Sequence, residues 1–198
     1  MKLLLALLTI AWLTGCATHT ELSTFQPELW QQHLSKIRGI RDWQAIAKVS
    51  IKTNKKGISA NLDWTQKGKS YRMALSGPMG FGKLVIDGTR ELARIQQNGE
   101  TVIGKPEVLV FDVTGIALPI DTWRWWLRGI PAPKDPTTKF VMTTAHGHAE
   151  SFVQSGWSLS FSKYRRTAAG YLPSRIIGRS DKISFKMLVS KWITPEEI

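Results

Sequence analysis

Residues 43–76 read WQAIAKVSIKTNKKGISANLDWTQKGKSYRMALS and hold three runs in which apolar and polar side chains alternate. The runs cover residues 43–52, 57–66 and 70–76, and Gly68 lies in the second of the two short connections. A period of two is typical of strands that bury one face. Short polar connections that contain glycine indicate antiparallel hairpins. This stretch therefore predicts an antiparallel meander with one apolar face.

The pattern on either side of this stretch predicts more strands and three helices. Apolar residues at helical spacing indicate an amphipathic helix over residues 28–37. Two short helices are expected at 106–114 and 121–128, since Pro106 suits a first helical turn and Pro119 separates the two segments. Further strands are expected at 82–87, 92–96, 101–103, 147–154, 157–164, 174–179 and 183–191, with an irregular proline-rich connection at 131–136. This order predicts a mainly β domain: one strongly curved antiparallel sheet with short helices across its open side.

The N-terminus has the features of a bacterial lipoprotein signal. Lys2 precedes an apolar run over residues 3–13, which is too short to span a bilayer. The run ends in Leu13-Thr14-Gly15-Cys16, which matches the lipobox. We interpret residues 1–15 as a signal peptide and residues 16–27 as a tether that begins at a lipidated cysteine. Cys16 is the only cysteine, so it forms no intramolecular disulfide; its expected lipids are an S-diacylglycerol and an N-palmitoyl chain.

The residue after the cysteine and the charge of the chain bear on location and partners. Ala17 stands where an aspartate would favour retention in the inner membrane, so we expect a lipid anchor in the outer membrane, on its periplasmic face. The formal net charge is +12, which is common in nucleic-acid-binding proteins, but export removes that partner. Outer-membrane phospholipids and acidic protein surfaces remain as polyanionic partners. The alternative is that the charge serves solubility alone.

The segment Gly77-Pro78-Met79-Gly80-Phe81-Gly82-Lys83 has the glycine and lysine spacing of a phosphate-binding loop. That function is rejected, because Leu84 stands where the loop needs Ser or Thr and a strand is expected where it needs a helix. The glycines permit a sharp excursion from the sheet. Met79 and Phe81 then form an exposed apolar tip, or else they fold back and cap the core.

Catalytic and metal-binding motifs are weak. His146-Gly147-His148 lacks a third ligand at motif spacing, so we expect a solvated loop and no metal site. The chain contains no G-x-S-x-G nucleophile elbow, and no carboxylate pair can be placed together. We therefore expect a protein that is not an enzyme and needs no cofactor.

Two segments make the chain similar to a known family. They are Leu75-Ser76-Gly77-Pro78-Met79-Gly80 and Trp123-Arg124-Trp125-Trp126-Leu127-Arg128-Gly129-Ile130-Pro131, between a lipobox and a final Lys191-Trp192-Ile193. This combination resembles the LolB family of outer-membrane lipoprotein receptors, over residues 30–193. The resemblance implies that residues 28–198 form a half-open β-barrel with a helical lid over an apolar cavity. It also implies that the cavity accepts acylated lipoproteins from the periplasmic carrier LolA and passes them to the inner leaflet of the outer membrane.

The resemblance also assigns functions to particular residues. Met79 falls where the family carries an apolar residue needed for insertion, most often Leu, and Met conserves its volume. Pro78, Gly80 and Phe81 complete this insertion loop. For the acyl-chain cavity, strand alternation and the expected lid give one set of candidates: Val49, Leu62, Trp64, Met73, Leu75 and Trp126.

Other functions stay open at the level of sequence. Tryptophans and other large aromatics line a cavity in some proteins but fill a solid core in most, and a shift of one residue in strand register would exchange the two faces. A structural lipoprotein that binds envelope proteins through its basic surface is the main alternative, and a lipid-modifying enzyme is a third. We expect a monomer.

Overall fold

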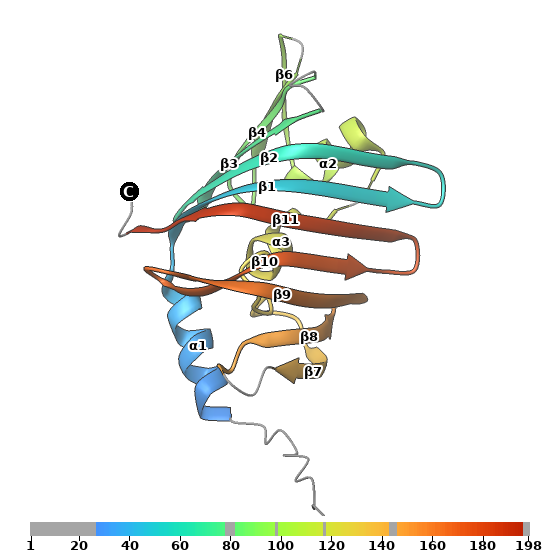
Figure 1. Ribbon diagram of the computed structural model, residues 1–198. Coiled ribbons are helices and arrows are strands. Elements are labelled where there is room, and N and C mark those ends of the chain that lie inside the picture. Colours follow the sequence, from blue (N-terminus) through green and yellow to red (C-terminus); the bar gives the residue numbers. More distant parts are fainter. Residues whose placement is uncertain (1–26, 78–81, 98, 117, 143–145, 196–198) are drawn as a thin grey trace, which may run out of the picture.

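The computed structural model describes residues 27–77, 82–97, 99–116, 118–142 and 146–195. The helices within these ranges are α1 (Pro27–Gly39), α2 (Pro106–Thr114) and α3 (Ile120–Trp126) (Figure 1). The strands are β1 (Asp42–Thr53), β2 (Gly57–Lys67), β3 (Ser70–Ser76), β4 (Leu84–Gly88), β5 (Ala93–Gln97), β6 (Glu100–Gly104), β7 (Thr137–Met142), β8 (Ala149–Gln154), β9 (Trp157–Thr167), β10 (Gly170–Arg179) and β11 (Ile183–Ile193). None of these helices is long and apolar enough to cross a membrane.

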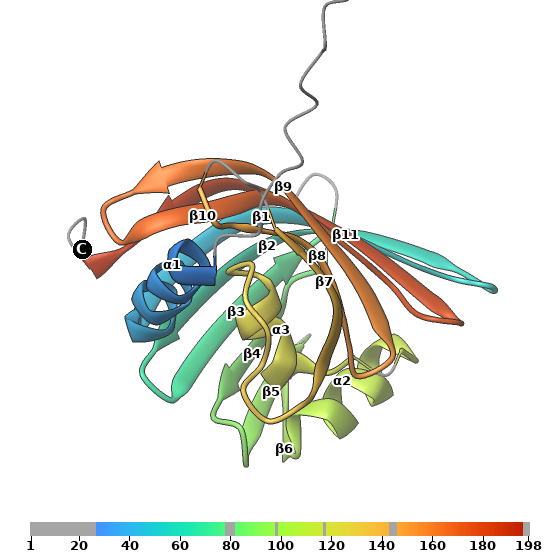
Figure 2. The same ribbon diagram turned by 90° about the horizontal axis from the view of Figure 1, so that it is seen from below.

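The described strands form one antiparallel sheet of eleven, in the order β6-β5-β4-β3-β2-β1-β11-β10-β9-β8-β7. The first and last strands of the chain, β1 and β11, pair at its centre, where Val49 lies opposite Met187. The sheet curves strongly, and the helices lie within its concave side (Figure 2). Because β6 and β7 at the two edges do not pair with each other, the barrel stays half open. The predicted fold class is confirmed.

The concave face of the sheet carries the core. On β1 the alternate residues Trp43, Ala45, Ala47, Val49 and Ile51 are buried, as the sequence period predicts. Neighbouring strands add side chains to the same face, and α1 covers one end of it with its own apolar side. The pleat therefore sorts the sequence into an inner apolar layer and an outer polar surface.

Strand β7 is missing from the prediction, which gives an irregular connection at 131–136 and places the next strand at 147–154. Its alternation is broken: the register with β8 shifts twice, and Lys139 has a positive φ of 48°. β7 is also an edge strand that pairs with β8 alone, and such strands show a less regular alternation of apolar and polar side chains. The boundaries of β9, β10 and β11 extend beyond the predicted ranges by up to four residues.

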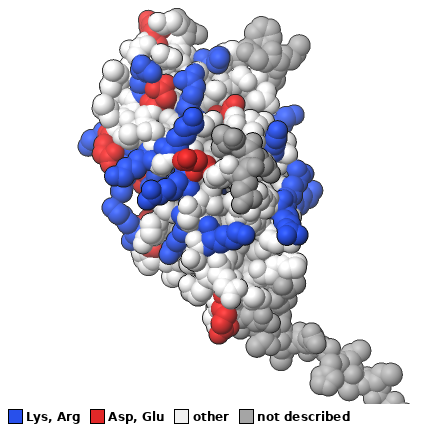
Figure 3. Space-filling model, turned by 90° about the vertical axis from the view of Figure 1, so that its left-hand side faces the viewer, with Lys and Arg blue, Asp and Glu red and all other residues white. Residues whose placement is uncertain are grey.

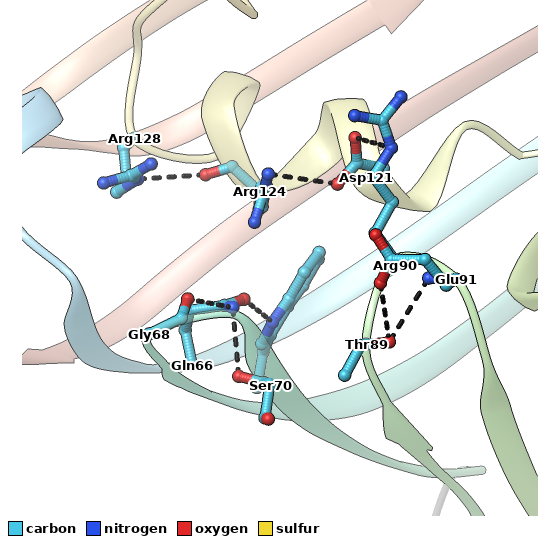
Figure 4. Close-up of polar contacts among 10 residues, drawn as sticks. Gln66, Gly68, Ser70, Thr89, Arg90, Glu91, Asp121, Arg124 and Arg128 are labelled. Carbon is cyan, nitrogen blue, oxygen red and sulfur yellow. Dashed lines mark hydrogen bonds and ion pairs between the residues drawn. The ribbon is translucent and has the colours of Figure 1, made fainter.

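Arg128 fixes α3 and α1 relative to each other. Its Nη1 donates hydrogen bonds to the carbonyl oxygens of Ile37 (3.0 Å) and Ile40 (2.8 Å) at the end of α1. Its Nε donates to the carbonyl oxygen of Arg124 (3.0 Å), as Figure 4 shows. The guanidinium also lies 4.8 Å from the ring centroid of Trp125. Burial, with Arg124 as a smaller cause, lowers the pKa of Arg128 to about 9, so the group stays charged at neutral pH.

Candidate lipid-binding cavity

An apolar cavity of about 70 Å³ lies between the concave face of the sheet and the helices. Strands β1 to β4 form its floor through residues that are apolar without exception: Val49, Ile51, Ile58, Ala60, Leu62, Trp64, Met73, Leu75, Leu84 and Ile86. The roof consists of Val110, Thr114, Leu118, Ile120 and Trp123, from α2, α3 and the connection between them. Such a surface suits hydrocarbon and offers almost nothing to a polar ligand.

Helix α2 has an apolar outer side as well as an apolar inner side. Val110 lines the cavity, whereas Val108 and Phe111 are about half exposed, at 53% and 52%. The helix packs against the edge strand β6 and its neighbour β5 and is capped by Gly115, whose φ of 65° is readily adopted by glycine. A helix that is apolar on both sides and lies at the edge of a sheet is only partly buried by the fold.

Five of the six residues expected in the cavity line it. Val49, Leu62, Trp64, Met73 and Leu75 come together there, although they belong to three different strands. The alternation therefore assigned the correct face to each of these strands.

Trp126 is not among the cavity residues. Its indole Nε1 donates a hydrogen bond to Oε1 of Gln154 (2.8 Å), and its ring lies 5.9 Å from that of Trp157. Trp123, one helical turn earlier, lines the cavity in its place, and Trp125 is half-buried. Trp123 and Trp126 are both buried, so spacing alone could not tell which tryptophan contacts the cavity.

Asp121 at the beginning of α3 forms two ion pairs, one to the β4–β5 connection and one within the helix (Figure 4). Asp121 accepts contacts from Arg90 in the β4–β5 connection (3.3 Å) and from Arg124 one turn along the helix (3.2 Å). The Arg90 side chain is 48% exposed, and such pairs contribute about 1 kcal/mol or less. Nearby, Gln66 donates to the carbonyl oxygens of Gly68 and Ser70 and so fixes the β2–β3 turn. Apolar packing of residues such as Ile120 and Trp123 therefore holds the lid on the core, and the ion pair with Arg90 adds little.

The expectation of a solvated loop at His146-Gly147-His148 is wrong for His148, which is 3% exposed. Its ring lies 4.8 Å from the ring of His33 on α1 and 4.5 Å from that of Tyr164, while His146 stacks on Tyr171 at 5.6 Å. No local pattern indicates that His33 of α1 would meet His148, which lies 115 positions later in the chain. Among the described residues, no group of three or more His, Cys, Asp or Glu side chains is arranged to hold a metal ion.

The buried histidines predict that acid weakens the fold. Burial lowers the pKa of His33 from 6.5 to about 4, with His148 as a second cause, and burial also lowers the pKa of His148 to about 4, with His146 as a second cause. Between pH 6.5 and about pH 4 the unfolded chain binds protons at these histidines that the folded chain does not bind. The free energy of unfolding therefore falls as the pH drops from 6.5 to about 4. The loss is on the order of 3 kcal/mol for each histidine.

Urea unfolding at a series of pH values measures this fall in the free energy of unfolding. The His33→Leu variant should lose about half of this pH dependence, and an unchanged slope would contradict the explanation.

Two sets of predicted site residues lie outside the described residues. They are Cys16 and the insertion-loop residues Pro78, Met79, Gly80 and Phe81. The strands that flank the loop are described: Leu75 near the end of β3 pairs with Leu84 at the start of β4, and both line the cavity. The loop thus connects two strands of the cavity floor. Leu84 begins a strand rather than a helix, in agreement with the rejection of a phosphate-binding loop.

Known proteins resemble this chain in sequence and in fold. The family model "Outer membrane lipoprotein LolB" matches residues 41–192. The outer-membrane lipoprotein LolB of Cellvibrio japonicus is 32% identical over 195 residues, which cover 96% of this chain and 95% of the relative. LolB of Pseudomonas fluorescens is 29% identical, with 93% and 92% covered. A LolA superfamily protein from Nitrosomonas europaea has a similar fold, with a TM-score of 0.53 at 11% identity over 83% of this chain and 93% of that protein. The family match extends over most of the sheet and both lid helices, and the chain therefore belongs to the LolB family of outer-membrane lipoproteins.

Proposed function

We propose that this protein accepts acylated lipoproteins from the periplasmic carrier LolA into its apolar cavity and inserts them into the inner leaflet of the outer membrane. One observation carries the proposal: fifteen residues from four strands, two helices and the connection between the helices converge on a single cavity, and Thr114 is the most polar of them. Lipid modification at Cys16 would keep this cavity close to the membrane that receives the lipoprotein.

The energetics of the cargo explain why such a receptor is needed. Each methylene group moved from water to an apolar site contributes about 0.8 kcal/mol, so a lipoprotein with several acyl chains does not cross water unaided. A cavity that binds the chains more tightly than the carrier, and less tightly than the bilayer, moves them in one direction without an energy source.

The cavity must enlarge to hold cargo. Its volume of about 70 Å³ is far below the roughly 300–1,000 Å³ typical of ligand pockets. The side chains of the roof that line the cavity meet the strands through apolar contacts, and the Asp121–Arg90 pair is weak, so the roof can move without unpairing any strand. An acyl chain would separate α2 and α3 from the strands and take the place of their mutual apolar contacts.

Met79→Glu should separate acceptance from delivery. The chain beginning at Ala17 is mixed with carrier-bound, radiolabelled lipoprotein, and the label is followed first to this protein and then to liposomes. The variant should accept label as well as wild type does but deliver at least about tenfold less, because a carboxylate at the tip costs roughly 2 kcal/mol or more to enter an apolar phase.

Met79→Leu is the matched control, since it conserves volume and apolar character, and it should deliver normally. If no label leaves the carrier for the wild-type protein, the receptor function fails and a structural lipoprotein becomes the better explanation. If Met79→Glu delivers normally, the loop is not the delivery device.

A further inference from the structure

A second, larger cavity lies between α1, the residues before β8 and the β9–β10 hairpin, and polar and apolar groups share its lining. Its volume is about 870 Å³, and it shares no lining residue with the apolar cavity. Helix α1 forms one wall with Gln32, His33 and Lys36, and the end of β9 and the start of β10 contribute Arg166 and Tyr171. The acyl-binding proposal makes no use of it.

The charge of this second cavity is uniformly positive among the described lining residues. Lys36 and Arg166 are both exposed, and no ion pair between described residues involves either of them. No described carboxylate lines the cavity, whereas His33, His146, His148 and Tyr171 do. Basic side chains also predominate over acidic ones on the face of the molecule where α1 lies (Figure 3).

The walls are rigid rather than loose. Gly147 packs so closely on α1 that a Cβ there would lie 2.7 Å from Cβ of Leu29. The rings of His33, His146, His148 and Tyr171 contact one another in sequence, at centroid distances of 4.8 to 5.6 Å. The Nε2 atom of His33, which is 9% exposed, has no hydrogen-bond partner among the described residues. The cavity thus has a preformed polar wall with capacity for further hydrogen bonds.

We infer that this cavity binds the phosphate of a phospholipid headgroup. Guanidinium and ammonium groups bind phosphate oxygens by charge-assisted hydrogen bonds, and the amide, phenol and imidazole groups add neutral donors. The cavity flanks the first helix after the lipidated tether, and residues 16–26 can reach at most about 40 Å from a lipid at Cys16. The oxyanions present in quantity within that reach belong to the bilayer.

The test uses the chain beginning at Ala17, which keeps every described residue but lacks the covalent anchor. Binding is measured to vesicles of phosphatidylcholine with a minor fraction of phosphatidylglycerol. The double variant Lys36→Gln, Arg166→Gln should bind them at least about tenfold more weakly than wild type. Its matched control is Arg38→Gln, Lys191→Gln, which removes the same charge from exposed residues that do not line the cavity. The control should lose about threefold at most.

Imidazole NMR signals of His33 and His148 identify the source of the phosphate. Soluble dihexanoylphosphatidylglycerol should shift them in wild type and in the control but not in the Lys36, Arg166 variant. Equal losses of vesicle binding in both double variants would mean that general surface charge binds the vesicles, and would overturn the inference. No loss in either variant would mean that the cavity makes no contact with the membrane, and would overturn it as well. Signals that respond to inorganic phosphate but not to the lipid would mean a free phosphate ligand and would overturn the membrane assignment. None of these outcomes affects acyl transfer, which depends on the other cavity.

Discussion

Replacing Ala60 with Phe is expected to reduce acceptance of acylated lipoprotein about thirtyfold while the protein stays folded. Ala60 is a half-buried residue of β2 that lines the apolar cavity, and its neighbour across the strand pair is Val49. A phenyl ring there fills the space that the proposed function assigns to an acyl chain. Displacing two or three methylene groups of the chain costs about 2 kcal/mol, which corresponds to a factor of about 30 in affinity. Transfer of label from the carrier at several receptor concentrations measures the change.

Asn61→Phe is the matched control for this experiment. Asn61 is exposed, and the alternation of the strand places it on the opposite face of the sheet from Ala60. The Asn61→Phe variant adds a phenyl ring outside the cavity, so acceptance of acylated lipoprotein should be unchanged. Equal acceptance by the Ala60 variant, at a normal melting temperature, would show that the cargo does not bind in this cavity. That result would remove the main support for the proposed function.

Replacing Arg128 with Met is expected to lower the free energy of unfolding by about 3 kcal/mol. Methionine fills the volume of the side-chain stem but leaves the carbonyl oxygens of Ile37 and Ile40 without their charged donor. The Ile37 carbonyl still accepts a hydrogen bond from the backbone N–H of Ile40 (3.3 Å), so the larger loss falls on the Ile40 carbonyl, where an unsatisfied buried acceptor costs about 1–3 kcal/mol. The contacts with Trp43 and Trp125 add a smaller loss. The variant no longer buries a charge, and the free energy that this burial costs offsets part of the loss in stability. The melting temperature should fall by about 6–12 °C for a domain of this size.

Two further variants locate the cause of that loss. Arg128→Lys keeps a charge but cannot contact both carbonyls and Arg124 at once, so its stability should be intermediate. Arg124→Met removes a partly exposed ion pair with Asp121 and should cost about 1 kcal/mol or less. If Arg128→Met melts at the wild-type temperature, the free-energy cost of burying the charge equals the stabilisation from its hydrogen bonds. Arg128 would then not stabilise the packing of α1 against α3.

The sequence by itself determined the fold class, the helices and the inner face of the sheet. Alternation over residues 43–76 was enough to place Val49, Leu62, Trp64, Met73 and Leu75 on one surface, because a strand directs every second side chain to the same side. The proline positions likewise marked α2, which was predicted over the same residues as it occupies. These features depend on local geometry, which a short stretch of sequence carries completely.

Only the tertiary structure decided which lid tryptophan reaches the cavity, how small the cavity is, and which groups surround α1. Trp123 rather than Trp126 lines the cavity because Gln154, 28 residues beyond Trp126, accepts the indole hydrogen bond of Trp126. His148 is buried because α1 lies across the strands that follow it, and Arg128 carries a function in stability because two carbonyls at the end of α1 come within its reach. Each of these outcomes depends on contacts between segments far apart in the chain, and the period of a local sequence contains no information about where those segments meet.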